Sequence, residues 1–451
     1  MRISPFMLIG VLLLPAQPVL ADEVQSRDFW ALQKSSTPAD LQPNFPQFSP
    51  SAYRPTSSTQ SWMVAEQTPP ATAPQKPTPA ATAERPDGTE AVMAAQTKLA
   101  WELIERLSKE GSADSTISPA GLASAFAILA KGADAKMKAA IATALGFETG
   151  DPAKSLVALS KARTALSANS GEMLQSADRI IIEPESAPPP HLAARLKKLG
   201  VEFTAEDLSK PEAVARIDEW VKKTTQGAIP EILGEPLDKA SFAVLDALHF
   251  KGTWKDQFDP QKTSQTAFQS ADGSNGDVAM MHLAKGSHVY RTNDKFIGID
   301  LPFSNERFSL TVITTMEKPA QVAEFAEVKD WLSGAGFEER KGDLAMPRFK
   351  LSARSDLLPA LDAFGLAKGR HSPTALAGFG QGTVLSRVLQ RAIIEVDEEG
   401  ATAAAATAIV GRRSVDDSLH MVVDKPFIFA LRDHESGLIL VAGYIGRAPS
   451  H

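Results

Sequence analysis

The stretch that decides the fold is Val396–Ser414, which reads Val-Asp-Glu-Glu-Gly-Ala-Thr-Ala-Ala-Ala-Ala-Thr-Ala-Ile-Val-Gly-Arg-Arg-Ser. From Ala401 to Val410 it has no charge and no side chain larger than that of Ile409. Four consecutive alanines favour a helix by intrinsic propensity, so one interpretation is an exposed helix or a small-residue linker. The stretch has no polar stripe to solvate such a helix, and it ends in β-branched residues that prefer extended backbone.

As a strand, this stretch would carry small and nearly apolar side chains on both of its faces. Neither face bears a group that is costly to bury, so the strand could enter between two existing strands. Gly400 allows the backbone to swivel at the start of the stretch. Arg412 and Arg413 at its end suit a trypsin-like protease, whose pocket carries a carboxylate. The combination suggests a trap for a protease.

The following segments, Met421–Leu431 and Arg432–Tyr444, resemble the C-terminal signature of the serpins. In that family the signature lies just after the reactive loop, as it does here. Further similarity is present at Ile117–Ala133 and at Ala243–Trp254, and the whole resemblance covers residues 89–449. Together with the export signal described below, it marks the chain as a suspected secreted bacterial serpin.

The resemblance implies an α+β fold with N-terminal helices, large antiparallel or mixed β-sheets and an exposed reactive loop near the C-terminus. The order of the residue patterns is consistent with this class. Apolar spacing predicts helices, and apolar or alternating runs predict strands, the run before Gly252 being a central strand. The predicted helices are 92–111, 120–131 and 211–223, and the predicted strands include 179–183, 243–251, 278–281, 298–303, 308–315 and 344–351.

The resemblance also implies which residues form the hinge and the reactive bond. The hinge residues are Glu398, Glu399, Gly400, Ala401, Thr402, Ala403, Ala404, Ala405 and Ala406. In serpin loops the residue before the cut is usually about the seventeenth, counted with the first hinge acid as one. Counted from Glu398, the seventeenth residue is Ser414 and the sixteenth is Arg413. We predict cleavage between Arg413 and Ser414, because arginine suits a trypsin-like pocket. Cleavage after Arg412 or after Ser414 is the alternative, and the arginines could also serve only to keep a loop soluble.

Four residues are expected to control the opening of the sheet. Trp254 matches the family tryptophan near the top of the sheet, and Ser118 matches a serine of the shutter region. The chain departs from the family at Asp246, where an asparagine is usual, and at Gln390, where a histidine is usual. A second shutter serine is replaced by Gly121. We expect an Asp–Gln contact in place of the family's Asn–His hydrogen bond, because a buried aspartate needs a partner or a proton.

The implied function is suicide-substrate inhibition of a trypsin-like serine protease through a covalent acyl complex, without a cofactor. The alternatives are a non-inhibitory serpin that acts as a carrier or interaction scaffold, and a plain protease substrate. An enzyme is not expected: the sequence has no Gly-x-Ser-x-Gly elbow and no His-Glu-x-x-His motif, and its eight histidines show no metal-ligand spacing. The net charge of −7 gives no reason to expect nucleic acid as a partner, and we expect a monomer.

The N-terminal composition predicts three parts for the chain. Residues 1–21 have a basic start, an apolar core and a small-residue end, as a cleaved export signal does. Residues 22–88 are rich in Pro, Ser, Thr and Ala and are predicted to be a disordered linker. Residues 89–451 would form the serpin domain. The expected location is the periplasm or the extracellular space, with no membrane contact after signal cleavage, and the absence of cysteine means no disulfide.

Overall fold

The computed structural model describes residues 88–109, 113–147, 151–168, 174–184, 190, 194, 202–238, 242–398 and 418–449. These residues lie within one unit of the chain, Thr78–His451. The predicted export signal, and the predicted linker up to residue 87, lie outside the described residues.

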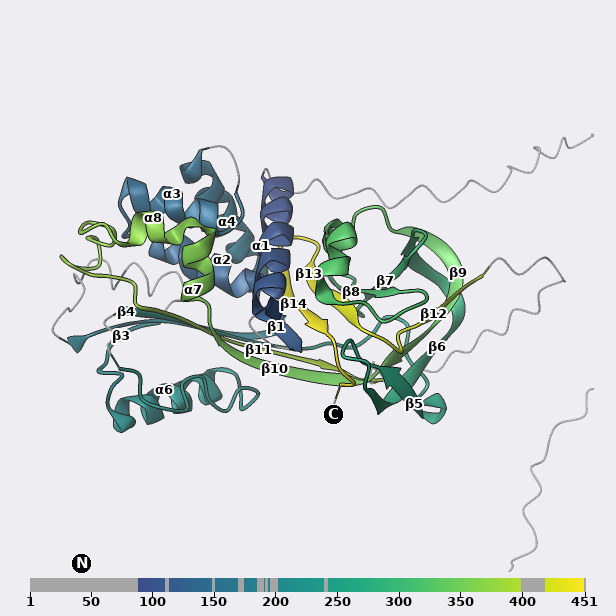
Figure 1. Cartoon of the computed structure of the whole chain (residues 1–451). Coiled ribbons are helices and arrows are strands. Elements are labelled where there is room, and N and C mark those ends of the chain that lie inside the picture. Colours follow the sequence, from purple (N-terminus) through teal and green to yellow (C-terminus); the bar gives the residue numbers. More distant parts are fainter. Residues whose placement is uncertain are drawn as a thin grey trace, which may run out of the picture. The chain divides into compact units, whose positions relative to one another are not determined.

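The described helices and strands are shown in Figure 1. The helices and helical turns are α1 (Thr89–Lys109), α2 (Pro119–Leu129), α3 (Ala135–Ala144), α4 (Pro152–Ala168), α6 (Pro211–Thr224), η2 (Pro260–Lys262), η3 (Val322–Ser333), α7 (Leu358–Leu361), η4 (Asp362–Leu366) and α8 (Ala367–Arg370). The strands are β1 (Asp114–Ile117), β2 (Leu174–Ile182), β3 (Glu202–Ala205), β4 (Phe242–Lys251), β5 (Ser264–Gln269), β6 (Asn275–Thr292), β7 (Phe296–Pro302), β8 (Phe308–Thr315), β9 (Glu338–Pro347), β10 (Phe349–Asp356), β11 (Arg387–Val396), β12 (Leu419–Val422), β13 (Phe427–Asp433) and β14 (Ile439–Ile445).

A five-stranded sheet runs through the middle of this unit, with the strand order β10-β11-β4-β2-β3. Its central strand, β4, is buried at every position except its last, Lys251. A strand buried on both faces needs a continuous apolar run rather than an alternating one. The prediction of a central strand before Gly252 is therefore confirmed.

Helices cover both faces of this sheet, as Figure 1 shows with α2 on one side and α6 on the other. On the α6 side, Ala243, Leu245 and Ala247 of β4 pack in one apolar cluster with Val214 and Ile217. On the α2 side, the alternate residues of β4 belong to a second and larger cluster with the residues of α2. The side chains of one strand thus alternate between two cores.

The second sheet has nine strands in the order β1-β14-β13-β8-β7-β6-β9-β12, and β5 pairs with β6. The predicted strands 278–281, 298–303 and 308–315 correspond to part of β6 and to β7 and β8. The prediction of a single strand at 344–351 is wrong, because β9 ends at Pro347 in the nine-stranded sheet and β10 begins at Phe349 in the five-stranded sheet. The large apolar residues stand at even positions up to Met346 and at odd positions from Phe349, so the alternation shifts by one residue at the junction, and reading the run as one strand overlooked this shift.

The helix predictions hold closely. Helix α2 begins at Pro119, one residue before the predicted start, and α6 covers the predicted 211–223 with one further residue. Ser118 caps α2 through its side chain, and Pro119 occupies the first helical position, where its missing N–H costs nothing. Strand β2 is longer than predicted, since it begins at Leu174. None of the described helices is long and apolar enough to cross a membrane.

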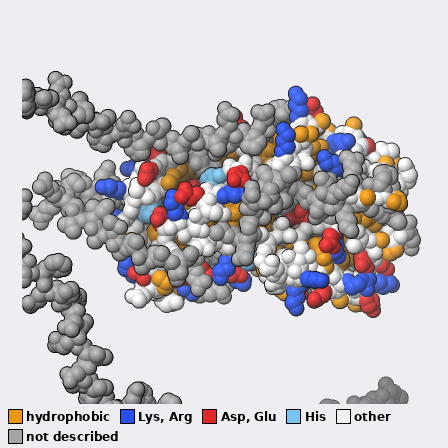
Figure 2. All heavy atoms as spheres, turned by 180° about the vertical axis from the view of Figure 1, so that it is seen from behind, with side chains coloured by type: hydrophobic (Ala, Val, Ile, Leu, Met, Phe, Trp, Pro, Cys, Tyr) orange, Lys and Arg blue, Asp and Glu red, His pale blue; other side chains and the backbone are white. Residues whose placement is uncertain are grey.

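Acidic and basic side chains are interspersed on the face of the protein seen in Figure 2. Exposed ion pairs of the protein include Lys255 with Glu306 at 2.9 Å and Lys295 with Glu327 at 3.0 Å. Mixed charges of this kind create no strong field of a single sign over the face.

Candidate functional site

The candidate site is the boundary between β4 and β11, which lie side by side in the five-stranded sheet. The two strands are parallel over nine residue pairs, from Arg387 opposite Ala243 to Glu395 opposite Lys251. Their outer neighbours, β2 and β10, are antiparallel to them. A strand placed between β4 and β11 would therefore run antiparallel to both. A chain that leaves the end of β11 and turns back has this direction, so the topology provides a place for the segment that follows Val396.

Trp254 fixes the backbone at the end of β11. Its indole Nε1 donates a hydrogen bond to the carbonyl oxygen of Asp397 at 2.8 Å. The indole is 3% exposed and stacks on the ring of Phe303, with the ring centres 4.3 Å apart. The residue predicted to lie near the top of the sheet thus holds the point at which the chain leaves it.

Glu398, the first predicted hinge residue, is also held in place. Its side chain is buried and accepts hydrogen bonds from Arg348 Nη2 at 2.5 and 2.6 Å and from Thr263 Oγ1 at 2.5 Å. Burial raises the pKa of Glu398, but the hydrogen bonds from Arg348 and Thr263 and the charge of Arg348 outweigh this and hold the pKa below its usual value. The glutamate is therefore an ionised anchor between β11 and the start of β10.

Replacing Glu398 with glutamine should make the protein less stable, by roughly 1 kcal/mol at pH 7, since Arg348 is partly exposed and the ion pair is partly screened. Because the pKa of Glu398 is lower in the folded protein than its usual value of 4.5, the ionised carboxylate adds stability at pH values above 4.5. This stability is lost as the pH falls through the folded-state pKa. The difference in melting temperature between wild type and Glu398→Gln should thus shrink below about pH 4.

Glu338→Gln is the matched control, because Glu338 is an exposed carboxylate on β9 for which no hydrogen bond or ion pair is recorded among the described residues. It should change the melting temperature by little at any pH. A Glu398→Gln difference that stays the same from pH 3 to pH 7 would contradict the ionised anchor.

Further from the end of β11, at the same boundary, Gln390 connects the sheet to the start of α2. Its Oε1 accepts from the backbone N–H of Ser118 at 2.7 Å, and its Nε2 donates to the carbonyl oxygen of Ser118 at 2.8 Å. The same Nε2 donates to Asp246 Oδ2 on β4, also at 2.8 Å. The predicted contact between Asp246 and Gln390 is present, and this amide bridges β11, β4 and the start of α2.

Sequence reasoning missed one residue of this cluster, Asp178 on β2. It lies directly opposite Asp246 in the antiparallel pairing of β2 with β4. Our predicted strand began at Arg179, so Asp178 was left outside it. Extending the alternation of Ile180 and Ile182 backward by one step would have placed Asp178 on the face that points toward α2.

The remaining predicted site residues lie outside the described residues. These are the hinge from Glu399 to Ala406 and the reactive-bond candidates Arg412, Arg413 and Ser414. The chain is described again from Ser418, and β12, which begins at Leu419, pairs with β9 at the end of the nine-stranded sheet. Residues 399–417 thus connect β11 of one sheet with β12 of the other.

A family model described as serpin (serine protease inhibitor) matches residues 94–447 of this chain. The chain belongs to the serpin family. The match spans the helices before the five-stranded sheet, both sheets and the site described above, so the resemblance found in the sequence motifs is confirmed over almost the whole described part of this serpin.

Two relatives match this serpin over most of their own length. Leukocyte elastase inhibitor from Sus scrofa is 29% identical over 375 residues, which are 78% of this chain and 98% of the relative. Glia-derived nexin from Rattus norvegicus is 28% identical over 352 residues, 73% of this chain and 87% of the relative. Both relatives are animal proteins, and the first is named as an inhibitor of a protease.

Solved structures confirm the predicted α+β serpin fold. Native protease nexin-1 with heparin superposes with a TM-score of 0.65 at 21% identity and covers 80% of this serpin and 100% of that chain. Serpin48 from the insect Tenebrio molitor gives a TM-score of 0.66 at 24% identity, covering 79% and 97%. At these identities the similarity establishes the fold.

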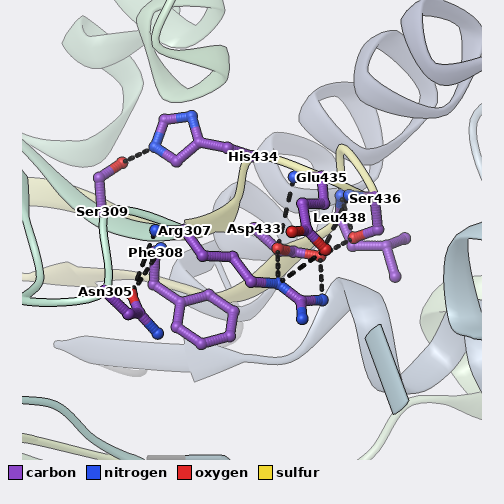
Figure 3. Close-up of polar contacts among 9 residues, drawn as sticks. All are labelled: Asn305, Arg307, Phe308, Ser309, Asp433, His434, Glu435, Ser436 and Leu438. Atoms are coloured by element: carbon purple, nitrogen blue, oxygen red, sulfur yellow. Dashed lines mark hydrogen bonds and ion pairs between the residues drawn. The ribbon is translucent and has the colours of Figure 1, made fainter. Parts of the chain in front are cut away.

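The structure also brings together a serine and a histidine that the sequence search did not pair. Ser309 Oγ lies 3.0 Å from His434 Nε2 (Figure 3). The serine is fully buried, and its Oγ also accepts a hydrogen bond from Arg432 Nη2 at 3.0 Å. A hydroxyl in this position is closed to a substrate, so we interpret the contact as structural rather than catalytic.

Proposed function

We propose that this serpin is a suicide-substrate inhibitor of trypsin-like serine proteases outside the cytoplasm. The observation that carries the proposal is the parallel pair β4–β11, with a segment of small side chains leaving the end of β11. A strand that enters between them would have a packed core on each side, and only small uncharged residues can enter at low cost. From Ala401 to Val410 the chain supplies ten such residues.

The chemistry would follow the usual acylation of a serine protease. The protease serine oxygen attacks the carbonyl carbon of Arg413, and the peptide bond between Arg413 and Ser414 breaks. The amine of Ser414 takes up a proton and leaves, while Arg413 stays bound as an ester. The chain itself acts as substrate, so it needs neither a nucleophile nor a cofactor of its own.

Insertion of the cut loop would then trap the protease. From Ala401 to Arg413 there are 13 residues, and at about 3.3 Å per residue a strand of this length moves the ester by roughly 43 Å. Pulling the protease this far against the body of the serpin would distort its active site before water releases the ester. The free energy for this movement would come from the new strand pairing that the intact sheet lacks.

The test is to mix the purified chain with trypsin and to separate the products on a denaturing gel. A band at the summed mass that survives denaturation supports the trap. Clean cleavage of the loop, with the trypsin still fully active, would instead favour a plain substrate or a non-inhibitory serpin that serves as a carrier or scaffold.

Replacing Arg413 with alanine should lower the rate of covalent complex formation with trypsin by at least about 100-fold, since the protease pocket loses its charged partner. Arg412→Ala is the matched control, because it removes the same charge one position earlier and should leave most of the complex. Loss of the complex in Arg412→Ala alone would place the reactive bond one residue earlier.

We further infer that the chain is exported and acts as a monomer in the periplasm or the extracellular space. The support for export is the basic, apolar and small-residue order of residues 1–21. Bacterial origin stays a prediction, because the relatives named above come from animals. N-terminal sequencing of the protein recovered outside the cytoplasm would test the cleavage after Ala21.

A further inference from the structure

Two carboxyl groups face each other across β2 and β4, beside the boundary at which the sheet would open. Asp178 and Asp246 are directly opposite in the antiparallel register, so their side chains lie on the same face of the sheet as neighbours across the strands. Asp246 is 2% exposed, and Asp178 is partly buried. Two neighbouring carboxyl groups can be joined by a hydrogen bond only when one of them keeps its proton.

Among the side chains that the structure describes, the elements around the pair bring polar groups but no further titratable group toward Asp246. Gln390 of β11 donates one hydrogen bond to it, and α2 has no ionisable residue along its whole length. The start of α2 packs so closely on Asp246 that a Cβ added at Gly121 would lie 2.0 Å from Oδ2. The glycine that replaces the family serine therefore makes room for this carboxyl group.

The charged residues next to the pair in sequence point to the other face of the sheet. Arg179 lies over the ring of Trp220 in α6, with the guanidinium carbon 3.8 Å from the ring centre, and Arg391 pairs with Glu231. Helix α4, which packs on α2, has exposed lysines at 154 and 161. The same-face neighbours of Asp246 along β4 are the buried Val244 and Leu248.

This environment favours a single negative charge on the pair. The amide of Gln390 and the positive end of the α2 dipole stabilise one charge. A second charge in contact with the first, in a buried place, is much more costly. In agreement, burial raises the pKa of Asp246 far above its usual value, and the charge and hydrogen bond of Asp178 raise it further, while Gln390 lowers it.

We propose that Asp178 and Asp246 share one proton in the closed sheet, and that losing this proton loosens the boundary between β4 and β11. The link to the boundary is Gln390, which bonds Asp246 across it. The protein thus carries a pH-sensitive latch at the place where a strand would enter. The proposal concerns the intact sheet and stands whether or not the chain inhibits a protease.

The sign of the pH dependence follows from linkage. The folded protein keeps the proton at a pH where the unfolded chain, with an ordinary aspartate pKa of 3.8, has lost it. Stability from this pair is therefore fully present below about pH 4 and falls as the pH rises toward the folded-state value. The contribution of this pair to the closed sheet should therefore be largest near pH 4 and should decrease toward alkaline pH, opposite in sign to the contribution of Glu398.

Asp246→Asn in the full chain tests the latch, because asparagine has the shape of the protonated acid. Its amide can donate to Asp178 while its carbonyl oxygen accepts from Gln390. The variant should melt roughly 2–6 °C above wild type at pH 8, and the gain should vanish near pH 4. Hydrogen exchange should show that the protection of β4 and β11 amides falls with pH in wild type and much less in the variant.

Two further variants separate the pair from a general effect of charge. Asp178→Asn should give a similar gain, and the double variant should add little to either one, because each removes the same repulsion. Asp277→Asn removes one exposed carboxylate from β6 and should give no pH-dependent gain.

An infrared difference spectrum detects the proton directly. Wild type minus Asp246→Asn at pH 7 should contain the carbonyl band of a protonated carboxylic acid. Absence of this band, or a variant gain that is equal at pH 4 and pH 8, would overturn the proposal. If Asp246→Asn fails to fold, Asp178→Asn and the wild-type spectrum across its own pH titration decide the question in the same way.

Discussion

Under the proposed mechanism, Ala403→Arg should turn the protein from an inhibitor of trypsin into a substrate that trypsin cuts and then releases. The replacement keeps the reactive bond and its arginines, but it also offers trypsin a second arginine, so fragment masses must show that the cut still falls after Arg413. Insertion, however, would carry the new guanidinium between β4 and β11, where apolar clusters lie on both faces of the sheet. Burying an unpaired charge there costs several kcal/mol, which slows insertion relative to hydrolysis of the ester.

The measurement is the number of serpin molecules consumed for each trypsin molecule inhibited. We expect this ratio to rise by at least about 10-fold in Ala403→Arg, in line with the cost of a buried charge. Asp416→Arg is the matched control, since it introduces the same side chain beyond the reactive bond, in a part of the loop that does not insert. An unchanged ratio in Ala403→Arg would mean that residue 403 does not enter the sheet.

Asp433→Ala should lower the free energy of unfolding by about 3–5 kcal/mol. Asp433 is 1% exposed and accepts hydrogen bonds from Arg307 Nε at 2.6 Å and Nη2 at 3.1 Å (Figure 3). It also accepts from the backbone N–H of Ser436 at 3.1 Å and from the Ser436 hydroxyl. Its removal leaves the buried guanidinium of Arg307 without its main partner and frees the turn between β13 and β14.

Denaturant unfolding followed by tryptophan fluorescence measures this loss. Glu435→Ala is the control, because Glu435 lies 3.5 Å from the same Arg307 Nε but its side chain is 54% exposed. An exposed ion pair of this kind contributes at most about 1 kcal/mol. Equal losses in the two variants would show that the buried geometry around Asp433 does not matter for stability.

Local residue patterns predicted two of the elements that build the site but not strand β11. The Ser118-Pro119 start predicted α2, and the apolar run before Gly252 predicted a central strand. These predictions hold because a cap or a buried strand depends on residues that are neighbours in the chain. The break between Pro347 and Phe349 was missed because the run was read as one strand, although its large apolar residues shift from even to odd positions there.

The family was readable from the sequence because its motifs are short runs of neighbouring residues, whereas the hinge from Glu399 to Ala406 stays a prediction. The tertiary structure alone decided which groups meet. Gln390 reaches Ser118 across 272 positions of sequence, and Asp178 meets Asp246 only through the register of two strands. Contacts of this kind result from long-range strand pairing, which no local pattern encodes. This pairing determines which groups surround the buried carboxyl group of Asp246.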